Sequence, residues 1–211
     1  MSFTNTATAL ENMVIARDVL AKRGVPLFLN FGTLLGAIRE HDFIAHDHDV
    51  DTGIYRKDED KLKDALPELI ERGFILFEVW SDRRCYSLQR GGEQIDIFVA
   101  YERSTVFGRT WNLDGKVSIP VAHLDSLDEL DFLGSTFYIP HDPVGLVAYL
   151  YGPTWNIPID GKASRIDLRS RIRAAAKSPL KTLAYLPTFV AHRIAWAASA
   201  RKAIRGRRPG A

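Results

Sequence analysis

Three aspartates spaced two residues apart constrain this 211-residue chain more than any other feature. They are Asp47, Asp49 and Asp51, in the segment FIAHDHDVD. Because alternate side chains of a strand point to the same face, a strand over residues 46–55 would bring the three carboxylates together. Carboxylates are poor strand formers and repel one another at close range. The pattern therefore indicates either an exposed acidic edge or a site for a divalent cation that relieves the repulsion.

A fourth aspartate, Asp96, lies inside the apolar run QIDIFV. A buried carboxylate is costly unless a partner or a metal compensates it, although an Asp on an edge strand could simply face solvent. If the two strands are neighbours, Asp96 completes a cluster with the earlier aspartates. Hard oxygen ligands of this kind suit Mg²⁺ or Mn²⁺, and we predict Asp49, Asp51 and Asp96 as the metal ligands.

A glycine-containing segment, FGTLLG, precedes the aspartates. We expect a short strand over residues 26–31, then a turn into a short helix. Gly32 and Gly36 would let the backbone approach a phosphate, and the free N–H groups of a helix start together with the Thr33 hydroxyl could donate to it. Arg39 could bind a phosphate through its guanidinium group, or could be an ordinary surface arginine.

The remaining pattern mixes helical and strand-like segments and predicts an α+β (mixed α/β) fold, with a small mixed sheet flanked by helices. The composition, with 46% hydrophobic and 26% charged residues, is typical of a globular protein. Residues 104–126 look irregular. Asp142 and Pro143 are residue types that favour the start of a helix. We expect this body to span residues 1–165.

The end of the chain differs in charge from the body. No acidic residue follows Asp167, whereas eleven Lys and Arg do, which leaves 17 basic and 26 acidic residues up to and including Asp167. Residues 166–211 therefore read as a basic, helical C-terminal extension. It could lie on an anionic membrane surface, pack on the acidic body, or form a dimer contact. No base-reading or stacking motif suggests nucleic acid as a partner.

Two features favour a cytoplasmic protein, with peripheral attachment to the inner face of the membrane if the extension binds lipid. The first residues contain no basic stretch followed by an apolar one, as a secretory signal would. Cys85 is the single cysteine of the chain, so no internal disulfide can form.

The order of these motifs resembles the LicD family of the nucleotidyltransferase superfamily. GTLLGAIRE followed by HDFIAHDHDVD is similar to the family signature, in which a Gly-Ser/Thr turn precedes Asp-x-Asp and a later carboxylate. Gly32 and Thr33 match the turn, Asp49 and Asp51 match the pair, and Asp96 matches the later carboxylate. The resemblance covers roughly residues 10–160.

Other positions extend the resemblance or depart from it. Asp47 matches an additional family aspartate, and the YGPTWNIP segment, with Tyr151 and Trp155, is similar to a C-terminal family motif. His48 stands where many members carry another acid. In a regular strand it would point away from the three aspartates, so this departure should not remove a ligand.

The resemblance implies transfer of a phosphorylated alcohol, such as phosphocholine or ribitol phosphate, from a CDP-linked donor. The acceptor would be a hydroxyl of a cell-surface glycan or of its lipid-linked precursor, and CMP would leave. The catalytic set would be Asp47, Asp49, Asp51 and Asp96, with Asp47 a candidate for accepting the hydroxyl proton. A true nucleotidyltransferase and a degenerate, non-enzymatic binding module are the alternatives.

The candidate substrate-binding residues combine the phosphate segment with aromatic positions. An aromatic face can hold a quaternary ammonium such as choline, although a tryptophan in a loop more often anchors packing. The full set is Gly32, Thr33, Gly36, Arg39, Trp111, Tyr151 and Trp155.

Overall fold

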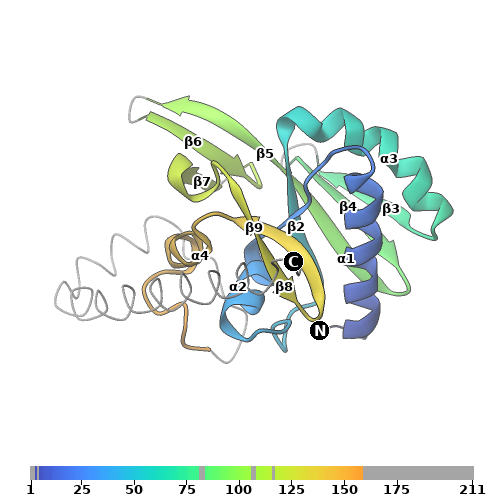
Figure 1. The fold of residues 1–211 in the computed structure, drawn as a ribbon, viewed down its shortest axis with the longest axis horizontal. Coiled ribbons are helices and arrows are strands. Elements are labelled where there is room, and N and C mark those ends of the chain that lie inside the picture. The colour runs from blue at the N-terminus through green and yellow to red at the C-terminus, as the bar shows by residue number, and fades with distance from the viewer. Residues whose placement is uncertain (1–2, 4, 81–83, 106–107, 116, 159–211) are drawn as a thin grey trace, which may run out of the picture.

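A mixed sheet with helices on both faces forms the body of the protein (Figure 1). The computed structural model describes residues 3, 5–80, 84–105, 108–115 and 117–158. The described helices are α1 (Thr6–Ala21), α2 (Phe31–Arg39), α3 (Glu59–Glu71) and α4 (Pro143–Tyr151). The described strands are β1 (Phe28–Leu29), β2 (Asp49–Tyr55), β3 (Ile75–Trp80), β4 (Cys85–Arg90), β5 (Glu93–Thr105), β6 (Gly108–Leu113), β7 (Val117–Pro120), β8 (Leu127–Phe132) and β9 (Ser135–Pro140).

The strand order places the aspartate-bearing strands in the middle of the sheet. It runs β3-β4-β5-β2-β1-β9-β8, and β6 and β7 continue from the far part of β5. β2 and β5 are parallel neighbours, whereas the flanking strands are antiparallel to them, β1 to β2 and β4 to β5. A strand in the centre of a sheet has both edges bonded, so β2 and β5 form a rigid platform for their side chains.

The two faces of this platform carry different helices. Tyr86 of β4 lies across from Ile97 of β5, and its hydroxyl donates to Glu59 Oε1 of α3 at 2.9 Å. α1 packs on α3 and on β5, so both helices cover this apolar face. On the opposite face the Phe31 ring of α2 meets the edge of the Phe98 ring, with 5.0 Å between centroids.

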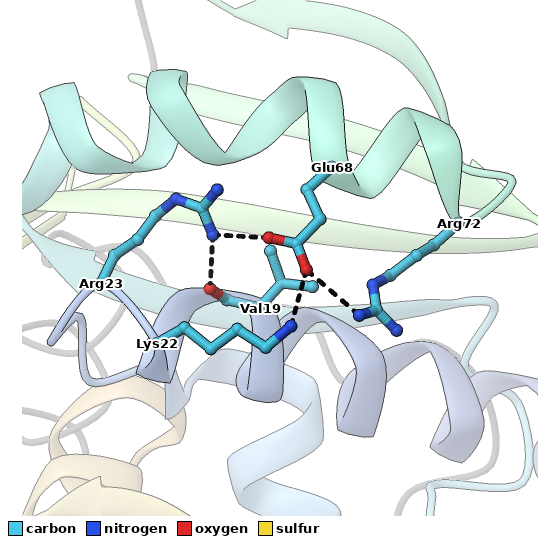
Figure 2. A network of polar contacts seen from close by, with 5 residues as sticks. All are labelled: Val19, Lys22, Arg23, Glu68 and Arg72. Carbon is cyan, nitrogen blue, oxygen red and sulfur yellow. Dashed lines mark hydrogen bonds and ion pairs between the residues drawn. The ribbon is translucent and has the colours of Figure 1, made fainter.

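A polar network fastens α1 to α3 at the surface (Figure 2). Glu68 of α3 accepts from Lys22 Nζ and Arg23 Nη1, each at 2.8 Å, and from Arg72 Nη2 at 3.1 Å. Arg23 Nη1 also donates to the Val19 carbonyl at 3.0 Å. Both helices also contribute fully buried apolar residues to the core, including Met13 and Val19 of α1 and Leu62 and Leu69 of α3.

The predicted α+β architecture, a mixed sheet flanked by helices, is confirmed, and one helix start is confirmed in detail. α4 begins at Pro143, and the Asp142 side chain accepts from the Gly145 amide at 3.1 Å, as expected of an N-cap. The expectation of an irregular segment over 104–126 is wrong. Its described residues contain β6 and β7, which pair as a hairpin beyond β5.

Three further bounds differ from expectation near the aspartates. β2 begins at Asp49 rather than at residue 46, and the strand expected over 26–31 shrinks to Phe28–Leu29. α2 starts at Phe31, so Gly32 and Gly36 belong to the helix rather than to a turn before it.

None of the described helices has the length and apolar character needed to span a membrane. The predicted extension, residues 166–211, lies outside the described residues.

Candidate active site

Three carboxylates meet on one face of the sheet, where β2 and β5 run side by side. The parallel register pairs Asp51 with Asp96 and Asp49 with Gln94. One carboxylate oxygen from each of Asp49, Asp51 and Asp96 lies within 4.8 Å of the others. Asp51 and Asp96 are buried and Asp49 is partly buried. The structure therefore brings together the three residues that the sequence suggested as metal ligands.

The first turn of α2 holds Asp51 in place. The Gly32 amide donates to Asp51 Oδ2 at 2.8 Å, and the Asp51 amide donates to Thr33 Oγ1 at 2.8 Å. A helix N-terminus carries free N–H groups and a partial positive charge, so it favours a carboxylate at this position. The predicted phosphate segment thus contacts the acidic cluster directly, with Thr33 accepting a bond from the backbone.

Both glycines of α2 are required by close packing. A Cβ on Gly32 would collide with Asp47 Oδ2 and lie 3.1 Å from Asp51 Oδ2. A Cβ on Gly36 would lie 2.6 Å from the Asp42 carbonyl oxygen. Gly36 therefore lets α2 lie against the segment that leads to Asp47, and Gly32 leaves room for two carboxylates beside the helix start.

Asp47 reaches the cluster from the segment before β2. Its carbonyl accepts from the Phe3 amide at 2.8 Å, and its amide donates to the Ile44 carbonyl at 2.9 Å. Phe43 anchors the same segment, because its ring contacts Phe3 and Phe132 at centroid distances of 4.9 and 5.2 Å. Tertiary packing, rather than strand periodicity, thus brings Asp47 to the other aspartates.

The crowding of negative charge in the cluster changes the pKa of Asp47. Burial raises the pKa of its carboxyl from 3.8 to about 6, and the charge of Asp49 adds to the increase. Asp47, His48 and Asp49 also form a second group whose ligand atoms lie within 4.8 Å of one another. Crowded carboxylates of this kind favour either a shared proton or a bound cation.

Asp96 is supported by a residue that the sequence reasoning missed. Gln94 Nε2 donates to Asp96 Oδ1 at 2.9 Å, from two residues earlier in β5. Their spacing of two was visible in the sequence, because it puts both side chains on one strand face. Asn30 is a second missed residue. It is a lone polar residue in the apolar run PLFLNF. A lone polar residue in an apolar run is also the pattern that drew attention to Asp96.

The residues present fit a divalent cation such as Mg²⁺ or Mn²⁺. Ligand oxygens stand about 2.1 Å from Mg²⁺, so those on opposite sides of the ion are about 4.2 Å apart. The oxygens of Asp49, Asp51 and Asp96 all lie within 4.8 Å of one another, which is close to that limit. Carboxylate oxygens are also the donors that these hard cations prefer.

Arg39 lies at the C-terminal end of α2, where it contacts the segment after α4. Arg39 Nε donates to Glu40 Oε1 at 2.7 Å and Arg39 Nη1 to the Trp155 carbonyl at 3.1 Å. Trp155 and Tyr151 are buried, which agrees with a packing role for both rings. A phosphate would have to compete with these contacts of Arg39, so substrate binding by this group stays a prediction.

Trp111 lies apart from the carboxylates. It sits in β6 opposite Glu102 of β5, six residues beyond Asp96. At ~3.3 Å per strand residue, this separation is about 20 Å. The ring packs on Tyr55, with 5.1 Å between centroids. The structure therefore does not bring Trp111 to the cluster, and its proposed contact with choline stays a prediction.

Carboxylates on adjacent strands, fixed by the first turn of a helix, define a site of the nucleotidyltransferase class. The family described as LicD/FKTN/FKRP, nucleotidyltransferase domain, matches residues 24–142. This match contains Gly32, Thr33 and all four aspartates of the site. The chain belongs to this family, as its motifs suggested.

Several curated proteins are similar to the chain over most of its length. Ribitol-5-phosphate transferase FKTN of Mus musculus is 30% identical over 161 residues, which is 72% of this chain and 34% of that protein. Ribitol 5-phosphate transferase FKRP of Homo sapiens is 31% identical over 145 residues, or 64% and 29% of the two chains. The uncharacterized protein RP689 of Rickettsia prowazekii is 29% identical over 144 residues, or 66% and 52%. The matched region thus spans between about a third and a half of these relatives.

A solved structure supports the fold. The antibiotic-resistance factor ANT(2'')-Ia superposes with a TM-score of 0.51, covering 95% of this chain and all of that one, at 15% identity. At this low identity the similarity concerns the fold alone.

Proposed function

We propose that this protein is a metal-dependent transferase that moves a phosphorylated alcohol from a CDP-linked donor to a glycan hydroxyl and releases CMP. The observation that carries this proposal is the convergence of Asp49, Asp51 and Asp96 at the start of α2. Two of the relatives are named as ribitol phosphate transferases, which supports a phosphorylated alcohol as the transferred group.

The bound Mg²⁺ or Mn²⁺ would be held by Asp49, Asp51 and Asp96, and it would neutralise charge on the diphosphate of the donor. Phosphoryl-type transfer needs positioning and charge compensation more than covalent help from the protein. The hydrogen bonds from Gly32 to Asp51 and from Gln94 to Asp96 serve this need, because they hold two of the proposed ligand carboxylates in fixed orientations.

The proposed reaction is a single displacement at phosphorus. The acceptor hydroxyl oxygen forms a bond to the phosphorus that carries the alcohol. The bond from that phosphorus to the CMP oxygen breaks, and CMP leaves with the electron pair. We assign the hydroxyl proton to Asp47, since a carboxylate with a pKa near 6 is a better base at neutral pH than an ordinary aspartate.

The proposed acceptor rests on the family to which the chain belongs, and the proposed location rests on the charge of the chain. We propose a cell-surface glycan or its lipid-linked precursor as the acceptor, reached from the cytoplasmic side. The basic residues that follow Asp167 would then attract an anionic membrane surface. Binding of the full chain to vesicles with and without phosphatidylserine tests this part separately. Equal binding to both would contradict it.

The function is tested by thermal stabilisation and turnover together. A ligand that binds the native state raises its melting temperature. We expect CDP-ribitol or CDP-choline to raise it only with Mn²⁺ or Mg²⁺, and by more than CTP or ATP does. We expect Asp49→Asn to lose this response and the release of CMP. Asp64→Asn, an exposed position on α3, is the matched control and should behave like the wild type.

Three outcomes would overturn the proposal. A response to triphosphates alone, with pyrophosphate as the product, would make the protein a true nucleotidyltransferase. Full turnover by Asp49→Asn would exclude the metal cluster from catalysis, and a lack of response to every nucleotide would favour a binding module without activity.

A further inference from the structure

A row of polar side chains crosses the sheet at the level of the metal cluster. Asp51 of β2 pairs with Asp96 of β5, Asp96 pairs with Ser87 of β4, and Ser87 pairs with Glu78 of β3. Residues paired on neighbouring strands lie on the same face. The row therefore continues the carboxylate face outward from Asp96 on one side.

Asn30 continues the same row on the other side of Asp51. The antiparallel register of β1 and β2 pairs Leu29 with Thr52, so the next pair is Asn30 with Asp51. The Asn30 amide N–H donates to the Asp51 carbonyl at 3.1 Å. Asn30 keeps an extended backbone, with φ −138° and ψ 170°, so the alternation of faces continues to this residue. Its side chain consequently shares the face of the carboxylates.

The Asn30 side chain is buried without a partner. Its exposed fraction is 0%, and neither amide atom has a hydrogen-bond partner within the part of the chain that the structure describes. A buried amide in this condition is unfavourable, because it has given up its bonds to water. Asn12 of α1 shows the ordinary arrangement. It is equally buried, and its Nδ2 donates to the Arg90 carbonyl at 2.9 Å.

The Asn30 side chain does not cap α2, which is the usual structural role of an asparagine at this position. Asn30 is the N-cap residue of α2, where a side-chain oxygen normally accepts from the backbone two or three residues later. Its side chain makes no such bond. The Gly32 amide donates to Asp51 instead, and only the backbone carbonyl of Asn30 enters the helix, accepting from the Leu34 amide at 2.8 Å.

We propose that the Asn30 side-chain amide is a further substrate-binding group, which donates a hydrogen bond to a phosphate oxygen of the nucleotide-linked donor. This inference rests on the proposed function for the position of the phosphates. An amide carries two N–H donors and no charge, so it can bind phosphate without forming an ion pair with Asp51. The cluster then keeps its full negative charge for the cation.

The test compares one substitution at two buried asparagines. Asn30→Leu removes an amide that has no partner, so the free protein should melt at the wild-type temperature or above it. The rise in melting temperature with Mn²⁺ and CDP-ribitol should be largely lost, and the dissociation constant should increase about tenfold or more, as expected for a bond to a charged group. Asn12→Leu should do the reverse, with a lower melting temperature and an unchanged ligand response.

A structural role would give a different result. If Asn30→Leu lowers the melting temperature of the free protein and leaves the ligand response intact, Asn30 supports the fold and the inference is wrong. Cytidine, which lacks phosphate, should bind wild type and Asn30→Leu equally. A loss of cytidine binding in the variant would mean that Asn30 contacts the nucleoside, and this would also overturn the phosphate assignment.

The same panel separates this inference from the proposed function. A wild-type response to CTP or ATP but not to CDP-alcohols would contradict the proposed function, and Asn30→Leu should still weaken that response. A response to CDP-ribitol that is the same in wild type and Asn30→Leu would contradict the inference alone. A wild type that responds to no nucleotide would overturn both.

Discussion

Two groups of charged side chains in this protein are built in opposite ways. Glu68 at the surface accepts bonds from Lys22, Arg23 and Arg72 (Figure 2). The bonds from Lys22 and Arg23 lower the pKa of its carboxyl to about 2. In the site, burial and the charge of Asp49 raise the pKa of Asp47 to about 6. The Glu68 carboxylate is paired with positive charges of the folded chain, whereas the Asp47 carboxylate lies beside the negative charge of Asp49.

This difference separates a structural group from a candidate functional one. The Glu68 network joins α1 to α3, and its energy is part of folding. The cluster of Asp47, Asp49, Asp51 and Asp96 costs stability in the free protein, because four carboxylates share a partly buried space. Groups that destabilise the free fold are expected at sites where a ligand later compensates them.

The largest effect is expected for Asp96→Asn. Loss of a residue that only supports a metal ligand typically costs 10- to 100-fold in affinity or activity, so loss of a ligand should reduce turnover by more than about 100-fold. Because one negative charge leaves a crowded cluster, the free protein should keep or increase its melting temperature. CMP release and thermal unfolding measure the two effects. A parallel loss of stability and activity would place Asp96 among the structural residues.

The second prediction concerns the space beside the helix start. Gly32→Ala should reduce turnover about tenfold or more, because the added methyl group collides with Asp47 and crowds Asp51. Gly24→Ala is the control. Its φ of 67° is strained for alanine but its surroundings are open, so it should lower the melting temperature and leave turnover unchanged. Wild-type turnover in Gly32→Ala would show that the close contact is dispensable.

The sequence predicted which aspartates lie together better than it predicted how the fold brings them together. Asp49, Asp51 and Asp96 were readable because a carboxylate in an apolar or alternating run is unusual, and α4 because Asp142-Pro143 is a strong start signal. Asp47 was predicted from strand alternation, but it lies before β2. The packing of Phe43 brings it to the other aspartates instead. The β6–β7 hairpin was missed because its residues, several of them exposed, lack clear alternation. The distance of Trp111 from the cluster depends on that hairpin.

The third prediction concerns the pH dependence of stability. Since the pKa of Asp47 is about 6 in the folded protein and ordinarily 3.8, the folded state holds this proton more tightly than the unfolded state. Without divalent cations, stability should therefore fall as the pH rises from about 4 to 6. Asp47→Asn removes this fall and should be roughly 1 kcal/mol more stable than wild type at pH 7. Denaturant unfolding at pH 4 and pH 7 measures this difference. Equal stability of the variant and the wild type at pH 7 would show that the buried charge of Asp47 does not destabilise the fold.

The smallest effect is expected for Glu68→Gln, and its sign is opposite. The lowered pKa of Glu68 means that its contribution to stability is complete above pH 4.5 and is lost as the pH falls toward about 2. The variant should melt slightly below wild type at pH 7, and the difference should shrink in this acidic range and in high salt, which screens exposed ion pairs. Turnover and metal response should not change. If Glu68→Gln altered the metal response, the two charged groups would be coupled across the sheet, and the division between a structural and a functional carboxylate would fail.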